Sequence, residues 1–366
     1  MAKLNMDILA HGRGEGEVAA HLIKNGRMNI GALRPYIGDD GYSYMTVYKG
    51  GDPKDPACYV EQRINANAVL RRDEWKQLDD ALVAATRYRL GGVDDLIASG
   101  LTYTLGNALG TTVLEWHDVS DAMQAVISMD GVTRGEGDRP EFQTNYLPIP
   151  IIHVDYEINA RVLEASRKLG NPLDTIEIEM AVRRIKEKLE NMLFTDDGYS
   201  YGELDDRSRN RIYGYVNHPD VNLVTLGTHW DASAKTSAGI LNDVLQMKAA
   251  SIAAYHFGPW KLYIPTNYEV ILDDDYDTTT PGITMRERLL KIDGITSIKV
   301  VDTLASDTVL LVQMTPDVVR MVQGFGIQNV EWKTEGGMVT KYKVMTIQVP
   351  QVRSDQNGKC GIVKLA

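Results

Sequence analysis

The chain has 366 residues, of which 43% are hydrophobic and 24% charged, and its formal net charge is −11. These values are ordinary for a soluble globular protein, and the length suffices for two or three compact units with cores of their own. The acidic balance argues against a sequence-specific DNA-binding protein, which usually carries a basic surface, and no apolar run reaches the roughly 18 residues of a membrane-spanning helix.

The N-terminal sequence, MAKLNMDILAHGRGEGE, lacks the apolar stretch of a secretory signal peptide, so we expect a cytoplasmic product. The two cysteines, Cys58 and Cys360, lie far apart in the sequence. A disulfide framework needs more cysteines and a metal site needs clustered ligands, so we expect two reduced thiols.

Residues 1–70 are rich in glycine and proline, which break helices and mark turns. They predict an extended arm with one short helix near residues 18–24. The first long helix is predicted from Asp73, a suitable N-cap, to a stop just before Gly91 and Gly92.

Residues 111–147 alternate between apolar and polar positions around a glycine-rich tip at residues 131–139, which predicts a long β-hairpin. Its apolar residues are too sparse for a core, and an isolated two-stranded ribbon is only marginally stable in water. We therefore expect the hairpin to lie on another surface. The segment carries seven acidic side chains and only two arginines: Glu115, Asp118, Asp121, Asp130, Glu136, Asp138, Glu141, Arg134 and Arg139.

Residues 147–159 predict a strand, and Pro148 and Pro150 confine its start to an edge or entry position. A short helical stretch is expected over residues 160–168. The strongest periodicity follows, over residues 175–194, where one apolar stripe predicts a four-turn helix with Asp174 as N-cap. The stripe contains Ile178, Val182, Ile185, Leu189 and Met192, and the opposite face carries Arg183, Arg184, Lys186, Glu187, Lys188 and Glu190.

The second half alternates helices and strands, which indicates an α+β fold. The nearly all-apolar segment at residues 308–314 predicts a central strand, and Pro316 suits the first turn of a helix. Helices are expected at residues 237–258, 285–292 and 316–325, and strands at residues 261–266, 268–272, 297–304, 308–314, 330–334, 341–353 and 360–365.

Residues with catalytic or metal-binding chemistry do not converge in the sequence. No histidine stands in a metal-binding pair or beside a cysteine: His11, His21, His117, His153, His218, His229 and His256. The acidic run at residues 273–277 lacks the glycine and the terminal glutamate of a calcium loop, and the glycines at residues 11–17 do not form a phosphate-binding motif. We therefore predict no catalytic residue, no cofactor and no metal site.

Taken in order, these elements resemble those of the Hong Kong 97-type shell proteins, a family that includes the major capsid proteins of tailed phages and the bacterial encapsulins. LRRDEWKQLDDALVAATRYRLGG (residues 70–92) is similar to the N-terminal helix of encapsulins, and residues 147–197 look like the family's strand, turn and spine helix. IYGYVNHPDVN (residues 212–222) and QVRSDQNGKCGIVKLA (residues 351–366) resemble the segment after the spine helix and the terminal strand pair of phage capsid proteins. The extension of about 70 residues before this region departs from common encapsulins and favours a virus.

The resemblance implies an α+β Hong Kong 97-like capsid fold with an extended loop, a peripheral domain and an axial domain. The expected segments are an N-terminal extension (1–70), an N-terminal helix and arm (71–110), the extended loop (111–147), a peripheral domain (148–225) with its spine helix (175–194), the axial domain (226–325) and return strands of the peripheral domain (326–366).

The function implied by the resemblance is that of a major capsid protein, without enzymatic activity. It would form pentamers and hexamers of itself in an icosahedral shell around the double-stranded DNA of a tailed phage, which it would enclose by non-specific proximity. The resemblance allows scaffold, portal and decoration proteins as further partners and involves no membrane. The shell would be assembled in the host cytoplasm and become part of the virion. The alternatives are an encapsulin-type compartment, an α+β enzyme with scattered catalytic residues, and a monomeric binding or tail-associated protein.

A docking hypothesis joins two of these segments. The acidic loop of one subunit is expected to contact the basic face of the next subunit's spine helix, unless both surfaces are simply solvated, since exposed ion pairs each contribute about 0–1 kcal/mol. The candidate contact residues are Glu136, Asp138, Arg139 and Glu141 on the loop and Arg183, Arg184, Lys186 and Lys188 on the helix.

Overall fold

The computed structural model describes residues 20, 23–24, 34–64, 71, 91–119, 129, 142–161, 176–196, 198–201, 210–276, 282–355 and 357–366. The chain divides into two compact units, each built from three separate segments. Unit 1 comprises Met1–Thr112, Ile149–Glu190 and Met321–Val349, and unit 2 comprises Val113–Pro148, Asn191–Arg320 and Pro350–Ala366. Of the predicted long helix, residues 73–90 lie outside the described residues. Gly91 and Gly92, which the sequence suggested as a stop, are helical and belong to α3 (Gly91–Ala98).

A four-stranded sheet with the order β4-β12-β13-β7 organises unit 1. Its two longest strands, β12 (Val319–Thr334) and β13 (Val339–Val352), are joined by the short turn η5 (Glu335–Gly337). β7 (Ile152–Asn159) pairs antiparallel with β13 and lies at the edge, as the flanking prolines predicted. β4 (Thr102–Thr104) closes the other edge, parallel to β12.

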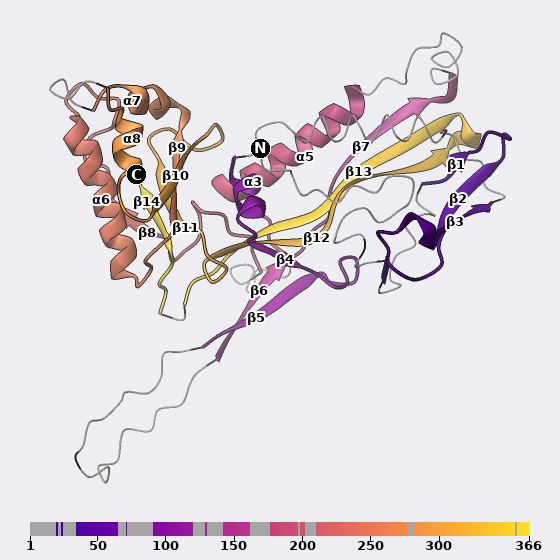
Figure 1. Cartoon of the computed structure of the whole chain (residues 1–366), viewed down its shortest axis with the longest axis horizontal. Helices are drawn as coiled ribbons and strands as arrows, with labels where there is room; N and C mark the ends of the chain where they lie inside the picture. Colours follow the sequence, from indigo (N-terminus) through magenta and orange to yellow (C-terminus); the bar gives the residue numbers. More distant parts are fainter. Residues whose placement is uncertain are drawn as a thin grey trace. The chain divides into compact units, whose positions relative to one another are not determined.

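The helix predicted from the apolar stripe is confirmed as α5 (Ile176–Phe194), which Figure 1 shows beside this sheet. Ile178, Val182, Ile185 and Leu189 are each at most 1% exposed, so the stripe is fully buried. Burial of this stripe supplies most of the free energy that holds the helix, because helix propensity alone contributes little.

A small antiparallel sheet lies in the part of the N-terminal region that the structure describes. It contains β1 (Tyr36–Ile37), β2 (Ser43–Tyr48) and β3 (Tyr59–Arg63). The sequence predicted only an extended arm here, and this was incomplete. Cross-strand aromatic pairs, such as Tyr48 and Tyr59 with ring centroids 5.5 Å apart, supply contacts that the glycine and proline content obscured.

Unit 2 is built on a five-stranded sheet with the order β10-β9-β11-β14-β8. The strands are β8 (Asn222–Val224), β9 (Trp260–Pro265), β10 (Ile295–Val301), β11 (Val309–Gln313) and β14 (Ile362–Leu365). β11 is central and wholly buried, as its apolar sequence predicted. β14 pairs with β11 and β8, so the last strand of the chain belongs to this sheet and not with the long strands β12 and β13.

The core of unit 2 forms where α6 (Ser237–Ala253), α7 (Glu269–Asp273) and α8 (Met285–Leu290) meet the sheet (Figure 1). Val244, Met247 and Leu289 are fully buried there beside residues of β9 and β11. The helix predicted at residues 285–292 is confirmed. The helix predicted over residues 237–258 ends earlier, at Ala253, because Tyr255 adopts a left-handed backbone conformation with φ 63°.

Two predicted elements are wrong in type. Residues 316–325, expected to be helical, enter β12, whose residues from Met321 to Asn329 are all buried, so neither side of the strand is left for solvent. Residues 268–272, expected to be a strand, are helical in η4 (Thr266–Tyr268) and α7, with Tyr268 and Leu272 buried one helical turn apart.

Candidate assembly surfaces

No centre of metal or catalytic chemistry is found among the residues that the structure describes. They contain no group of three or more His, Cys, Asp or Glu side chains placed to hold a metal ion. His229 Nδ1 lies 3.3 Å from Asp307 Oδ2, but no described serine or cysteine hydrogen-bonds to this histidine as a nucleophile would. Within the same described ranges, no helix is long and apolar enough to cross a membrane.

The outer face of α5 carries the first candidate surface. The side chains of Arg183 and Arg184 are 63% and 75% exposed, and both bind one carboxylate: Arg183 Nε donates to Glu187 Oε1 at 2.9 Å and Arg184 Nη1 to Glu187 Oε2 at 2.8 Å. Lys188 lies on the same exposed side of the helix. The loop residues of the docking hypothesis, Glu136, Asp138, Arg139 and Glu141, lie outside the described residues.

Lys186 does not belong to this exposed face. Its side chain is 1% exposed, and Glu190, one helical turn further, is 7% exposed. The expectation that Lys186 faces outward is therefore corrected: the buried arc of α5 is wider than its apolar stripe. Gly92 N of α3 donates to Glu190 Oε1 at 3.4 Å, which places the first turn of α3 against this side of the helix.

Burial disfavours the charged forms of both side chains. It raises the pKa of Glu190 to about 7, with the charges of Asp94 and Asp95 adding to the effect and the Gly92 amide opposing it. Burial lowers the pKa of Lys186 to about 8, which the charge of Asp94 partly offsets. Neither Lys186 Nζ nor Glu190 Oε2 finds a hydrogen-bond partner in the described structure. The protonated Glu190 side chain thus stabilises the fold fully at pH values below its ordinary pKa. This stabilisation is lost as the pH rises through about 7.

Glu190→Gln is therefore expected to stabilise the chain increasingly as the pH rises. Glutamine mimics the protonated acid, so the free energy of unfolding of the variant should exceed that of the natural chain by about 2 kcal/mol more at pH 7.5 than at pH 5. Urea unfolding followed by circular dichroism across this range measures the difference.

Glu187→Gln is the matched control on the same helix. Partial burial alone would raise the pKa of Glu187, but the hydrogen bonds from Arg183 and Arg184 hold this pKa below its usual range. The Glu187 carboxyl therefore titrates below the pH range of the experiment. A parallel pH profile for Glu190→Gln and the natural chain would contradict the assignment.

The ribbon β5–β6 is the second candidate surface. β5 (Val113–Val119) and β6 (Phe142–Pro148) pair antiparallel from Val113–Pro148 to Val119–Phe142, which confirms the base of the predicted hairpin. In the described part of the chain they pair with no third strand. His117 and Thr144 face each other across the ribbon, with His117 Nδ1 3.1 Å from Thr144 Oγ1. A two-stranded ribbon of this kind needs a further surface to be stable.

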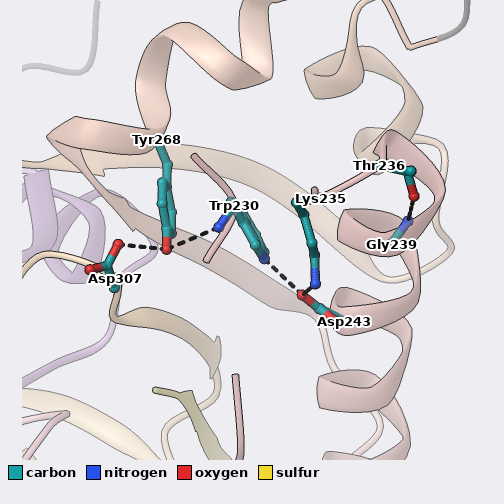
Figure 2. Close-up of polar contacts among 7 residues, drawn as sticks. All are labelled: Trp230, Lys235, Thr236, Gly239, Asp243, Tyr268 and Asp307. Carbon is teal, nitrogen blue, oxygen red and sulfur yellow. Dashed lines mark hydrogen bonds and ion pairs between the residues drawn. The ribbon is translucent and has the colours of Figure 1, made fainter. Parts of the chain in front are cut away.

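A polar network in unit 2 fixes the loop before α6 (Figure 2). The Tyr268 hydroxyl donates to Asp307 Oδ1 at 2.8 Å and accepts the Trp230 amide at 3.3 Å, while the Trp230 indole donates to Asp243 Oδ2 at 2.9 Å. Lys235 pairs with the same Asp243 carboxylate. The Tyr268 hydrogen bond holds the pKa of Asp307 below its usual range, so the network favours the ionised carboxylate. The network secures α6 in place.

Comparison with solved structures identifies the class of this fold. The chain is similar to the virus-like particle protein from Pyrococcus furiosus, with a TM-score of 0.54 and 18% identity over 80% of this chain and 98% of that one. It is also similar to the capsid of the Myoviridae phage XM1 (TM-score 0.56, 9% identity, 74% of this chain and 90% of that one). The capsid of a native GTA particle gives a TM-score of 0.55 at 10% identity, over 76% of this chain and 91% of that one. The chain therefore has the Hong Kong 97-type shell-protein fold.

The family follows from the sequence. Residues 65–365 match a family described as being of unknown function, DUF6260, and since the match spans most of the chain, the chain belongs to that family. A comparison with curated proteins found no match.

Sequence reasoning located the exposed arginines of α5 but missed the buried pair on the same helix. One signal was present: Lys186 and Glu190 each directly follow a residue of the apolar stripe, Ile185 and Leu189. Positions next to a stripe become buried when a second element packs beside the helix, as α3 does here.

Proposed function

We propose that this chain is a major capsid protein that assembles, as pentamers and hexamers of itself, into the icosahedral shell of a tailed phage. The observation that carries the proposal is the fold. The chain covers at least 90% of the XM1 capsid chain and of the GTA capsid chain at TM-scores above 0.5, so the likeness extends over the whole shell-forming chain and not one domain. The role is structural and needs no catalytic residue.

The exposed elements support the same function. The ribbon β5–β6 lacks a third strand within the described ranges, and α5 presents a cluster of cations to solvent. Both make physical sense if they contact neighbouring copies, because a closed shell repeats each modest contact many times. In this proposal unit 2 contains the axial sheet, while α5 and the strands β12 and β13 belong to the peripheral domain. The acidic loop within residues 111–147 would lie over the basic face of α5 on the next subunit.

An encapsulin-type compartment is the second candidate. The observation in its favour is the sequence identity. The chain is 18% identical to the virus-like particle protein of Pyrococcus furiosus, but 9% identical to the XM1 capsid protein and 10% to the GTA capsid protein. The extension of about 70 residues before the region that resembles encapsulins favours the phage.

Particles purified from the natural source of this chain separate the two functions. The phage proposal predicts nuclease-resistant double-stranded DNA of one genome length inside each particle, together with portal and scaffold-derived proteins detectable by mass spectrometry. Particles that hold a folded protein cargo and no DNA would contradict the phage assignment and establish the compartment.

A further inference from the structure

We propose that the outer face of helix α6 is a contact surface for a second copy of this chain. The outer face consists of the seven exposed positions of the helix: Ala238, Asn242, Leu245, Gln246, Ala249, Ile252 and Ala253. The inference rests on the proposed shell function and deepens it by naming one surface through which copies meet.

The outer face of α6 has an unusual composition for a solvent-facing surface. None of its seven positions is charged, and Leu245 and Ile252 are 44% and 41% exposed. A helix on the surface of a globular protein normally presents charged and polar residues on this side. The exposed side of α5, by contrast, carries Arg183, Arg184 and Lys188. The apolar outer face of α6 is therefore a property of this helix and not of the whole chain.

The two charged residues of α6 lie beside the outer face and are already bound within unit 2. Asp243 accepts hydrogen bonds from Trp230 and Lys235 (Figure 2), and Lys248 Nζ donates to the Asp293 carbonyl at 2.7 Å. The inner side of α6 is covered by unit 2, since Ile240, Val244 and Met247 are buried in the core. What remains on the outside is apolar surface that the folded subunit leaves uncovered, and such patches mark interaction sites.

The face is also held rigid at both ends. Thr236 caps the first turn by accepting the Gly239 amide at 3.1 Å (Figure 2). In the last turn, Ser251 Oγ donates to the His256 carbonyl at 3.1 Å and accepts the Trp260 indole at 3.0 Å. Past this end of the helix Tyr255 and Phe257 are 69% and 67% exposed, and Lys359 Nζ lies 3.8 Å from the centroid of the Tyr255 ring. A surface fixed before binding loses little conformational entropy on docking.

The charge of the chain indicates which partner binds the outer face of α6. Each copy carries a net charge of −11, so a contact between copies is favoured where the surface itself carries no charge that adds to the repulsion. The outer face of α6 meets this condition, and its three alanines allow another backbone to approach closely. Nucleic acid and an anionic lipid surface both require cations, which the face lacks. A second copy of the chain fits all these observations.

The size of the face fits a repeated contact better than an isolated dimer. α6 has 17 residues, and one side of it covers only part of the roughly 1,200 Å² that a stable pairwise interface buries. In a closed shell the same contact recurs in every capsomer, so a small apolar strip contributes to the assembly without causing dimers of free subunits.

Cysteine protection tests the inference on the full-length chain. Ala249→Cys is made in a Cys58→Ser background, since the remaining cysteine, Cys360, is 0% exposed. We expect a water-soluble maleimide to label the introduced thiol about tenfold more slowly in particles than in free subunits separated on a sizing column, because an interface core excludes solvent. Ala305→Cys, on the exposed turn after β10, supplies the rate of an open site in free subunits.

Each outcome of the labelling experiment either supports or overturns the α6 contact. Equal labelling rates in particles and free subunits would overturn the α6 contact while leaving the shell function intact. Protection that nuclease or detergent removes would assign the face to nucleic acid or lipid and overturn it as well. A natural chain that forms neither particles nor pentamers and hexamers would overturn the proposed function and this inference together. As a second variant, Leu245→Glu with Ile252→Glu should give folded subunits without particles, whereas Leu245→Met with Ile252→Val should still assemble.

Discussion

Replacing Arg183 and Arg184 together by glutamate is expected to abolish particle formation while the subunit stays folded. Both side chains are mostly exposed, and their ion pairs with Glu187 contribute at most about 1 kcal/mol each to the fold. Glutamate has a helix propensity close to that of arginine, so α5 should persist. The change nevertheless replaces two exposed cations with two anions on every copy of the chain, and the repulsion that this creates against an acidic partner surface is repeated at every equivalent contact in the shell. Circular dichroism and size-exclusion chromatography with light scattering measure the two properties separately.

Two further variants show whether charge is the cause. Arg183→Lys with Arg184→Lys keeps the positive charge and should assemble normally. Asp138→Arg with Glu141→Arg, added to the glutamate variant, should restore particles if the acidic loop is the partner of this face. Normal particles from the glutamate variant would contradict the docking hypothesis outright.

Gly294→Ala is expected to have the largest effect on the stability of unit 2. Gly294 has φ +89°, and a Cβ atom built there would lie 2.5 Å from Trp260 Cζ3. The indole of Trp260 is 2% exposed and belongs to the core between α6 and the sheet, so it has little room to move. Backbone strain and the clash together should lower the free energy of unfolding by about 2–5 kcal/mol. Thermal unfolding followed by circular dichroism should show a midpoint lower by about 5–15 °C.

Gly282→Ala separates the two causes. Gly282 has φ +99°, but nothing lies within 4 Å of the position its Cβ would take, so this variant carries backbone strain alone. Gly294→Ala should be clearly the less stable of the two, and adding Trp260→Leu to it should recover part of the difference. Equal midpoints for the two glycine variants would show that the close approach to Trp260 is unimportant.

The elements predicted correctly from sequence are those in which one local pattern dominates. The stripe of α5 and the apolar run of β11 each determine a single buried arrangement, and both were found. The start of β12 was misread because Pro316 provides a good helix start. Tertiary pairing decides there instead: Met321, Val322 and Gln323 pair with β4, and residues on both sides of the strand are buried. Such pairing between segments more than 200 residues apart leaves no local signal.

The candidate surfaces were predictable only where they depend on exposed charge. Arg183 and Arg184 face solvent as their position opposite the apolar stripe implied. Lys186 is two positions further along and is buried, because α3 covers that side of the helix and sequence periodicity records only the main stripe. The sequence predicted the helix that forms α6 but not which of its sides lies outside. Only the structure separates the residues that enter the core, such as Val244, from those left outside, such as Leu245.

Electron microscopy of the full-length chain expressed alone, with light scattering on the same sample, tests the central claim most directly. A shell protein of the Hong Kong 97-type fold should form uniform hollow icosahedral particles, or free pentamers and hexamers of a 40.7 kDa subunit. A reconstruction of those particles should place the described fold in every capsomer position. A homogeneous monomer that stays monomeric when coexpressed with the neighbouring genes of its source would contradict the proposed function.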